Sequence, residues 1–145
     1  MKIIKVLFLA LTLTFVSNIV TNAQDKAAEA TSKVNKLTVL WYSGDQMVAE
    51  RVALMYTGVA KQYKLFDDVS VIIWGPSAKL VAENKEIQAK VKEMMDLGIK
   101  VNACVTCANL YGVTDQLKAL GINVDIMGMP LTNALKADDT AVLTF

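Results

Sequence analysis

Residues 100–113 read KVNACVTCANLYGV, a stretch in which a short apolar run leads directly into a helical pattern. Residues 100–104 have the composition of a buried strand. Residues 106–111 predict a short helical turn, and Gly112 stands where helices commonly end. A strand that feeds a helix in this way is the repeating unit of α/β proteins, so this stretch indicates the fold class.

The same alternation of strand and helix extends to both sides of this stretch. Apolar runs such as Val71-Ile72-Ile73 are typical of strands buried on both faces of a parallel sheet. We therefore predict one three-layer α/β domain over residues 36–145, with a five-stranded, mainly parallel sheet between helices. The predicted strands are residues 37–42, 69–74, 100–104, 123–127 and 141–145, and the predicted helices are residues 47–63, 77–97, 106–111, a piece from 114, and 130–136.

The N-terminal residues have the composition of a secretory signal peptide over residues 1–23. A lysine-containing start precedes the mostly apolar residues 6–20, and small or polar residues follow up to Ala23. We predict cleavage after Ala23 and a periplasmic or otherwise exported protein without stable membrane insertion. An uncleaved anchor is the alternative, but the apolar run is short and interrupted. Residues 24–35 contain no large apolar residue except Val34 and predict a flexible leader.

Charge and composition restrict the classes of partner and of chemistry. The chain has 15 basic and 14 acidic residues without a basic run, which argues against nucleic acid or an anionic membrane as a partner. Small molecules or other proteins remain. The chain has no histidine, which excludes Ser-His and Cys-His catalysis. Its only two cysteines, Cys104 and Cys107, are the first candidates for reactivity.

The C-x-x-C pair admits several interpretations. A structural disulfide suits an exported protein, but a loop this short removes little entropy from the unfolded chain. A metal site needs about four ligands, and Ala108 takes the place of the histidine that haem attachment requires. A thioredoxin-like fold is disfavoured because the pair follows the third predicted strand. Redox chemistry and sulfur transfer are what such a pair suits best.

The turns that follow the predicted strands indicate a ligand-binding rim. In open parallel sheets, ligands bind outside the carboxyl ends of the strands, where neighbouring connections diverge to opposite faces. No cofactor is predicted, because no phosphate-binding loop is present. No metal is predicted either, because the methionines at helical positions, among them Met47 and Met55, are interpreted as core residues rather than copper ligands. The predicted rim around the cysteines consists of Ser43, Gly44, Trp74, Gly75, Pro76, Gly128 and Met129.

Four motifs together carry a resemblance to a known family. They are KVNACVTCANLYGV at 100–113, LKALGI at 117–122, MGMPLT at 127–132 and VLTF at 142–145. With these motifs the chain resembles the DsrE/DsrF-like family, over about residues 36–145. The resemblance implies a flavodoxin-like fold and assembly into trimers or hexamers. In the sulfur-relay branch it also implies a persulfide-carrying cysteine after the third strand, and Cys104 stands at that position.

The sequence thus leads to the hypothesis of an exported, sulfurtransferase-like sulfur carrier. Cys104 would hold sulfane sulfur as a persulfide, and Cys107 would resolve it by forming a disulfide. The partner would be a sulfur donor or acceptor, either a protein or a small sulfur compound. Two alternatives stay open: a non-catalytic oligomeric binding protein with a structural C-x-x-C disulfide, and a periplasmic dithiol redox protein.

Overall fold

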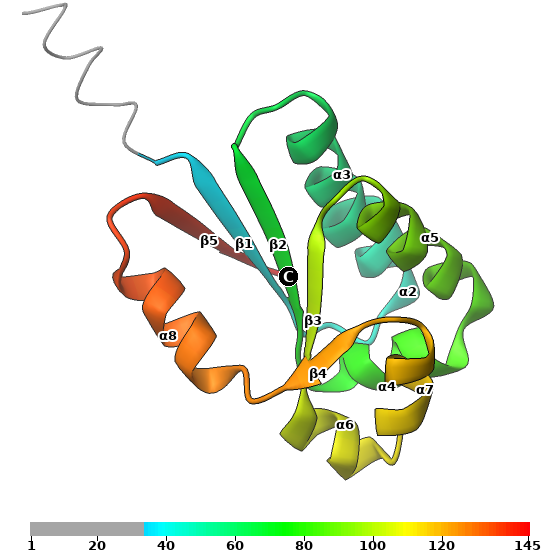
Figure 1. Cartoon of the computed structure of the whole chain (residues 1–145). Helices are drawn as coiled ribbons and strands as arrows, with labels where there is room; N and C mark the ends of the chain where they lie inside the picture. Colours follow the sequence, from blue (N-terminus) through cyan, green and yellow to red (C-terminus); the bar gives the residue numbers. More distant parts are fainter. Residues whose placement is uncertain (1–33) are drawn as a thin grey trace, which may run out of the picture. The chain divides into compact units, whose positions relative to one another are not determined.

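A computed structural model describes residues 34–145, which form one sheet with helices packed on it (Figure 1). The sheet has the strand order β4-β3-β2-β1-β5, and every neighbouring pair is parallel. The prediction of a five-stranded α/β domain is therefore confirmed, with a sheet that is parallel throughout. The predicted signal peptide and most of the predicted leader lie outside the described residues. The strands are β1 Lys36–Trp41, β2 Asp68–Ile73, β3 Lys100–Cys104, β4 Asn123–Asp125 and β5 Thr140–Thr144.

The helices cover the two faces of the sheet unequally. Figure 1 shows α3 and α5, with α4 and α7, on one face and α8 alone on the other, which gives the three predicted layers. No helix within residues 34–145 is long and apolar enough to cross a membrane. The helical elements are α2 Gln46–Val48, the π-helical η1 Ala49–Ala53, α3 Leu54–Gln62, α4 Pro76–Glu83, α5 Lys85–Asp96, α6 Val105–Tyr111, α7 Thr114–Ala119 and α8 Gly128–Lys136.

The direction of the chain across the sheet explains this unequal covering. From β1 to β4 the chain moves to the next strand on the same side each time, and right-handed crossovers then place the intervening helices on one face. From β4 the chain returns across the sheet to β5, so the same handedness places α8 on the opposite face. The connections that leave β3 and β4 therefore diverge. This divergence is where open sheets bind ligands, and Cys104 is the last residue of β3.

The core divides into two parts because successive strand residues point to opposite faces. The face under α3 and α5 carries fully buried residues such as Leu37, Val71 and Ala103. The face under α8 carries a smaller apolar cluster built on Ile72, Cys104 and Met127, with four partly buried side chains packed against it. We call this set the sulfur cluster; its partly buried members are Leu40, Trp74, Cys107 and Leu131.

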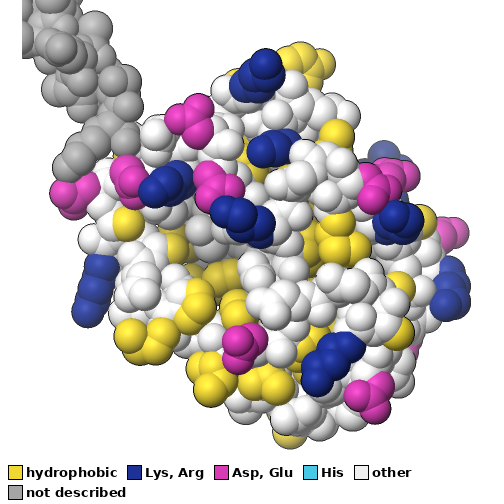
Figure 2. Space-filling model, in the orientation of Figure 1, with side chains coloured by type: hydrophobic (Ala, Val, Ile, Leu, Met, Phe, Trp, Pro, Cys, Tyr) yellow, Lys and Arg dark blue, Asp and Glu magenta, His cyan; other side chains and the backbone are white. Residues whose placement is uncertain are grey.

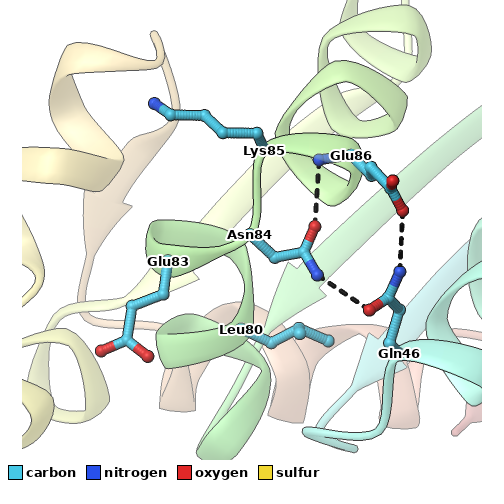
Figure 3. A pocket seen from close by; sticks show the side chains of 6 residues that line it. All are labelled: Gln46, Leu80, Glu83, Asn84, Lys85 and Glu86. Carbon is cyan, nitrogen blue, oxygen red and sulfur yellow. Dashed lines mark hydrogen bonds between the residues drawn. The ribbon is translucent and has the colours of Figure 1, made fainter.

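The prediction of one helix over residues 77–97 is wrong, because the chain breaks at Asn84 between α4 and α5. Asn84 has extended backbone angles of φ −107° and ψ 114° and caps α5. Its Oδ1 accepts the N–H groups of Glu86 and Ile87 at 3.0 and 3.1 Å, and its Nδ2 donates to Gln46 Oε1 at 2.9 Å (Figure 3). An asparagine at this position satisfies helix-end N–H groups that an unbroken helix would not expose.

The helical run from Gln46 to Gln62 lies where it was predicted, but its apolar side chains are distributed differently. The residues buried against the sheet are mainly small, such as Ala49, Ala53 and Ala60. Met47 and Met55 are 60% and 56% exposed, so the interpretation of these two methionines as core residues is wrong. The η1 segment adds to the change because its wider turn shifts the helical phase.

Candidate functional site

Cys104 and Cys107 lie where β3 passes into α6. Cys104 occupies the N-cap position of α6, and Cys107 is the third residue of this helix. Cys104 is only 4% exposed, whereas Cys107 is half-buried, and no disulfide joins them. The thiol of Cys104 lies near that of Cys107 and helps to raise its pKa. The structure therefore brings the two predicted reactive residues together as one unit with a buried and an accessible member.

The surroundings of the thiols are apolar on the side of the sheet. Both cysteines belong to the sulfur cluster, in which Ile72 and Met127 are buried beside Cys104. Burial raises the pKa of the Cys107 thiol above its ordinary value, and the neighbouring Cys104 raises it further. The N–H of Gly75 donates to the Cys107 sulfur and opposes this shift. The Cys107 thiol is consequently held in its neutral form more strongly than an ordinary cysteine.

The loop that presents this N–H is held in place by a buried serine. Ser77 is fully buried, and its hydroxyl lies 2.7 Å from the carbonyl oxygen of Trp41 and 3.1 Å from the N–H of Trp74. The Trp74 N–H also donates to the Trp41 carbonyl oxygen at 2.9 Å. These bonds tie the loop after β2 to the end of β1. Sequence analysis did not single out Ser77, and its only signal was a small polar residue directly after a Gly-Pro turn.

Gly75 sets the direction of its own N–H through an unusual backbone conformation. Its φ is +60° and its ψ is −135°, a combination that residues with a side chain rarely adopt. A Cβ at this position would meet nothing within 4 Å. Glycine is therefore needed here for conformation and not for space.

The predicted rim residues Ser43, Gly44 and Pro76 join the loops at the ends of β1, β2 and β5. Ser43 bonds its N–H to the Phe145 carbonyl oxygen at 3.2 Å and so ties the loop after β1 to β5. A Cβ on Gly44 would lie 2.9 Å from the Cβ of Pro76, which shows that the loops after β1 and β2 touch. None of these three residues belongs to the sulfur cluster.

The predicted Gly128-Met129 pair lies at the start of α8 and is exposed. Met129 is 64% exposed, whereas Met127, two residues earlier, is 4% exposed and contacts the sulfur cluster. Of the predicted rim, the structure therefore places Trp74 and Gly75 at the cysteines. It also places Met127, and not the predicted Met129, in the cluster with Cys104.

A cavity of about 560 Å³ elsewhere on the domain is a structural feature. Leu80 lines it, and three of its polar residues, Gln46, Asn84 and Glu86, are paired with one another (Figure 3). Asn84 donates to Gln46, and Gln46 Nε2 donates to Glu86 Oε2 at 3.0 Å. This network joins α2 to the start of α5. Within residues 34–145, no three His, Cys, Asp or Glu side chains gather as a metal site requires.

Comparisons with known proteins agree on one family. The model of the DsrE/DsrF-like family matches residues 27–145. The conserved protein of unknown function BT1422 from Bacteroides thetaiotaomicron is 34% identical, with 79% of this chain and 98% of that chain covered and a TM-score of 0.74. The ychN protein from E. coli is 16% identical, with 77% and 99% covered and a TM-score of 0.54, and shows the fold alone. No curated protein sequence matches the chain significantly. The chain therefore belongs to the DsrE/DsrF-like family.

Proposed function

We propose that this protein is an exported, sulfurtransferase-like sulfur carrier that holds sulfane sulfur as a persulfide on Cys104. Membership of the DsrE/DsrF-like family supports a sulfur-relay-related role at the level of the family. The observation that carries the proposal for this chain is the contact between the two thiols within the sulfur cluster. They lie at the carboxyl end of β3, where the connections of neighbouring strands diverge.

Loading of the carrier is an exchange that needs no oxidant. The sulfur of Cys104 attacks the sulfane sulfur of a donor persulfide R–S–SH, forms a new S–S bond and breaks the one in the donor. The departing R–S⁻ takes the proton that Cys104 loses, so the products are R–SH and the Cys104 persulfide. The burial of Cys104 supports this role, because the surrounding apolar side chains keep water and other thiols away from the loaded sulfur.

Release of the sulfur uses the second thiol. Cys107 attacks the inner sulfur of the Cys104 persulfide, and the new Cys104–Cys107 bond displaces the outer sulfur as hydrosulfide. The two cysteine sulfurs are oxidised to a disulfide while the outer sulfur is reduced, and the proton of Cys107 goes to the leaving group. A dithiol reductant must then restore both thiols. The proton that Cys107 loses as it attacks goes to the leaving sulfur, and the raised pKa of Cys107 makes this release slow, because the thiolate is the attacking form.

Export, partners and assembly belong to the same proposal. The composition of residues 1–23 supports export, and the family resemblance supports a trimer or hexamer. Exposed apolar side chains on α3 and at its C-terminal end, among them Met55, Val59 and Tyr63, support contact with another copy. The sulfur donor or acceptor would be a protein or a small sulfur compound, since the near-neutral charge disfavours nucleic acid.

Intact mass spectrometry of the purified protein after treatment with polysulfide tests the carrier function. We expect an adduct of about 32 Da, the mass of one sulfur atom, on the wild type. The adduct should disappear in Cys104→Ser and accumulate in Cys107→Ser, which cannot discharge it. No adduct on the wild type, or an adduct that survives Cys104→Ser, would contradict the proposal.

The proximity of the two thiols also favours a second candidate, a dithiol redox protein. Two sulfurs in contact can close a disulfide without a large movement of the backbone. Equilibration with glutathione measures the reduction potential of the pair. A potential between about −120 and −270 mV, together with no persulfide adduct, would select the redox function over the carrier.

A further inference from the structure

A groove of about 290 Å³ opens on the sheet face that α8 covers only in part. Figure 2 shows hydrophobic side chains inside this hollow, between α8 and the strands. Two of its lining residues, Ile72 and Met127, also belong to the sulfur cluster, which contains Cys104. The groove therefore borders the cluster that holds the Cys104 sulfur, although Cys104 itself does not line the groove.

The remaining lining is polar and carries free hydrogen-bonding groups. Asn123 Nδ2 donates to Asn102 Oδ1 at 3.0 Å. This pairing leaves the Nδ2 of Asn102 as a donor and the Oδ1 of Asn123 as an acceptor for a ligand. Thr38 and Ser70, whose hydroxyl oxygens are 3.1 Å apart, lie on the same face of the sheet. A purely structural sheet face under a helix would be expected to carry apolar side chains at these positions.

Asp125 determines which charge the groove accepts. It is the residue of β4 that stands directly beside Cys104 of β3 in the parallel register. One carboxylate oxygen accepts the N–H of Ile126 at 2.7 Å, and the side chain is exposed. No lysine or arginine within residues 34–145 lines the groove. The groove therefore favours a cation with hydrogen-bonding capacity and disfavours anions such as thiosulfate.

We propose that this groove binds the sulfur donor of the carrier and that the donor is a small amine-bearing persulfide, an aminothiol carrying one sulfane sulfur. This proposal rests on the proposed carrier function. The ammonium group binds Asp125 while the sulfane sulfur reaches Cys104. Neighbouring strands lie about 4.8 Å apart, so a spacer of about two carbons joins the two positions. Met127, an unbranched and adaptable side chain, shifts to admit the sulfur.

The reaction in the groove is the same sulfur exchange that was given above for loading. The Cys104 sulfur forms a bond with the sulfane sulfur, the S–S bond of the donor breaks, and the aminothiol leaves with the proton of Cys104. No redox partner is needed, because one persulfide replaces another. The carboxylate of Asp125 takes no part in the exchange and only positions the donor.

Two donors of similar length and opposite charge test the proposal. Cysteamine persulfide carries an ammonium group, and 3-mercaptopropionate persulfide carries a carboxylate. We expect the wild type to form the Cys104 adduct about fivefold faster with cysteamine persulfide, the factor that an ion pair open to solvent can supply. Asp125→Asn should bring the two rates together. Asp115→Asn, the same change on exposed α7, should leave the preference intact.

Equal rates with both donors in the wild type, or a preference that survives Asp125→Asn, would overturn the proposal while the carrier function stands. A direct binding measurement tests the groove in the opposite case, in which the carrier function fails. Cysteamine, which has no sulfane sulfur, is titrated into Cys104→Ala/Cys107→Ala and followed by amide NMR. Shifts confined to Asn102, Asn123 and Asp125 support the groove even where the wild type takes up no sulfur, and the absence of shifts there refutes it.

Discussion

Replacement of Gly75 by alanine measures how much the unusual conformation of the loop after β2 contributes to the site. Nothing lies within 4 Å of the added Cβ, so the change introduces no clash. It does place a side chain at φ +60° and ψ −135°, where a residue other than glycine costs about 1–3 kcal/mol. We expect a loss near the upper end, about 2–3 kcal/mol, because glycine alone commonly populates this region. Urea unfolding monitors the loss through a lower midpoint at an unchanged slope.

Gly112→Ala is the matched control for this experiment. Gly112 also has a positive φ, +68°, and also has nothing within 4 Å of a built Cβ. Its ψ of 28° places it in the ordinary left-handed region, where the cost is about 1 kcal/mol. We therefore expect the loss at Gly112 to be clearly smaller than the loss at Gly75.

A second measurement follows the pKa of the Cys107 thiol. If the peptide before residue 75 rotates in Gly75→Ala, the N–H that donates to Cys107 is lost and the pKa of this thiol rises further. Alkylation of Cys107, in a Cys104→Ser background, should then move to higher pH in Gly75→Ala and not in Gly112→Ala. Equal stability losses at the two glycines, with identical alkylation profiles, would refute this reasoning.

Three further predictions concern single interactions. Ser77→Ala removes the hydroxyl that bonds the Trp41 carbonyl oxygen, and it should cost about 1–2 kcal/mol in urea unfolding; no loss would show that the loop holds without it. The hydrogen bond with Lys36 lowers the pKa of Asp139. We therefore expect Asp139→Asn to be less stable than the wild type above pH 3.8, and this difference to disappear as the pH falls below that value. A difference that grows toward acid would contradict this assignment. Burial raises the pKa of Cys107, so its thiol form stabilises the fold below pH 9.0 and this contribution is lost as the pH rises further. Urea unfolding of the wild type and of Cys107→Ser at several pH values around 9.0 checks this direction; a wild type that gains stability relative to the variant as the pH rises would contradict it.

The strands and their shared edge could be predicted because their signals are local. Consecutive apolar residues such as those around Ile72 identify buried parallel strands, and the turns after them end the strands. The break at Asn84 was missed because an apolar period continues across it. Its capping function depends on Gln46, which lies 38 residues away in the sequence. Capping residues of this kind can be suspected from the sequence, but the partner that holds them is a tertiary feature.

The proximity of Cys104 and Cys107 could be predicted from the sequence, and the surroundings of the two thiols less so. Cys104 and Cys107 are close because they are close in sequence. The contact of Gly75 with Cys107 depends on how the loop after β2 folds over α6, and no pattern encodes this. Met127 and Met129 are alike in sequence, and only the packing of α8 decides that the first is buried beside Cys104. The groove was missed because its polar residues come from four strands.

The helical run from Gln46 to Gln62 has a consequence for how the protein tolerates change. Its contact with the rest of the domain is made mainly by small residues together with Leu54, and a Cβ added to Gly58 would lie 3.2 Å from the Cε of Met94. Enlarging Ala53 or Ala60 would force the helix away from the sheet. Met55 and Tyr63, although far more hydrophobic, face outward. In a single copy, Met55 and Tyr63 should therefore tolerate substitution better than Ala53 and Ala60, so hydrophobicity alone does not show which residues of this run variation should spare.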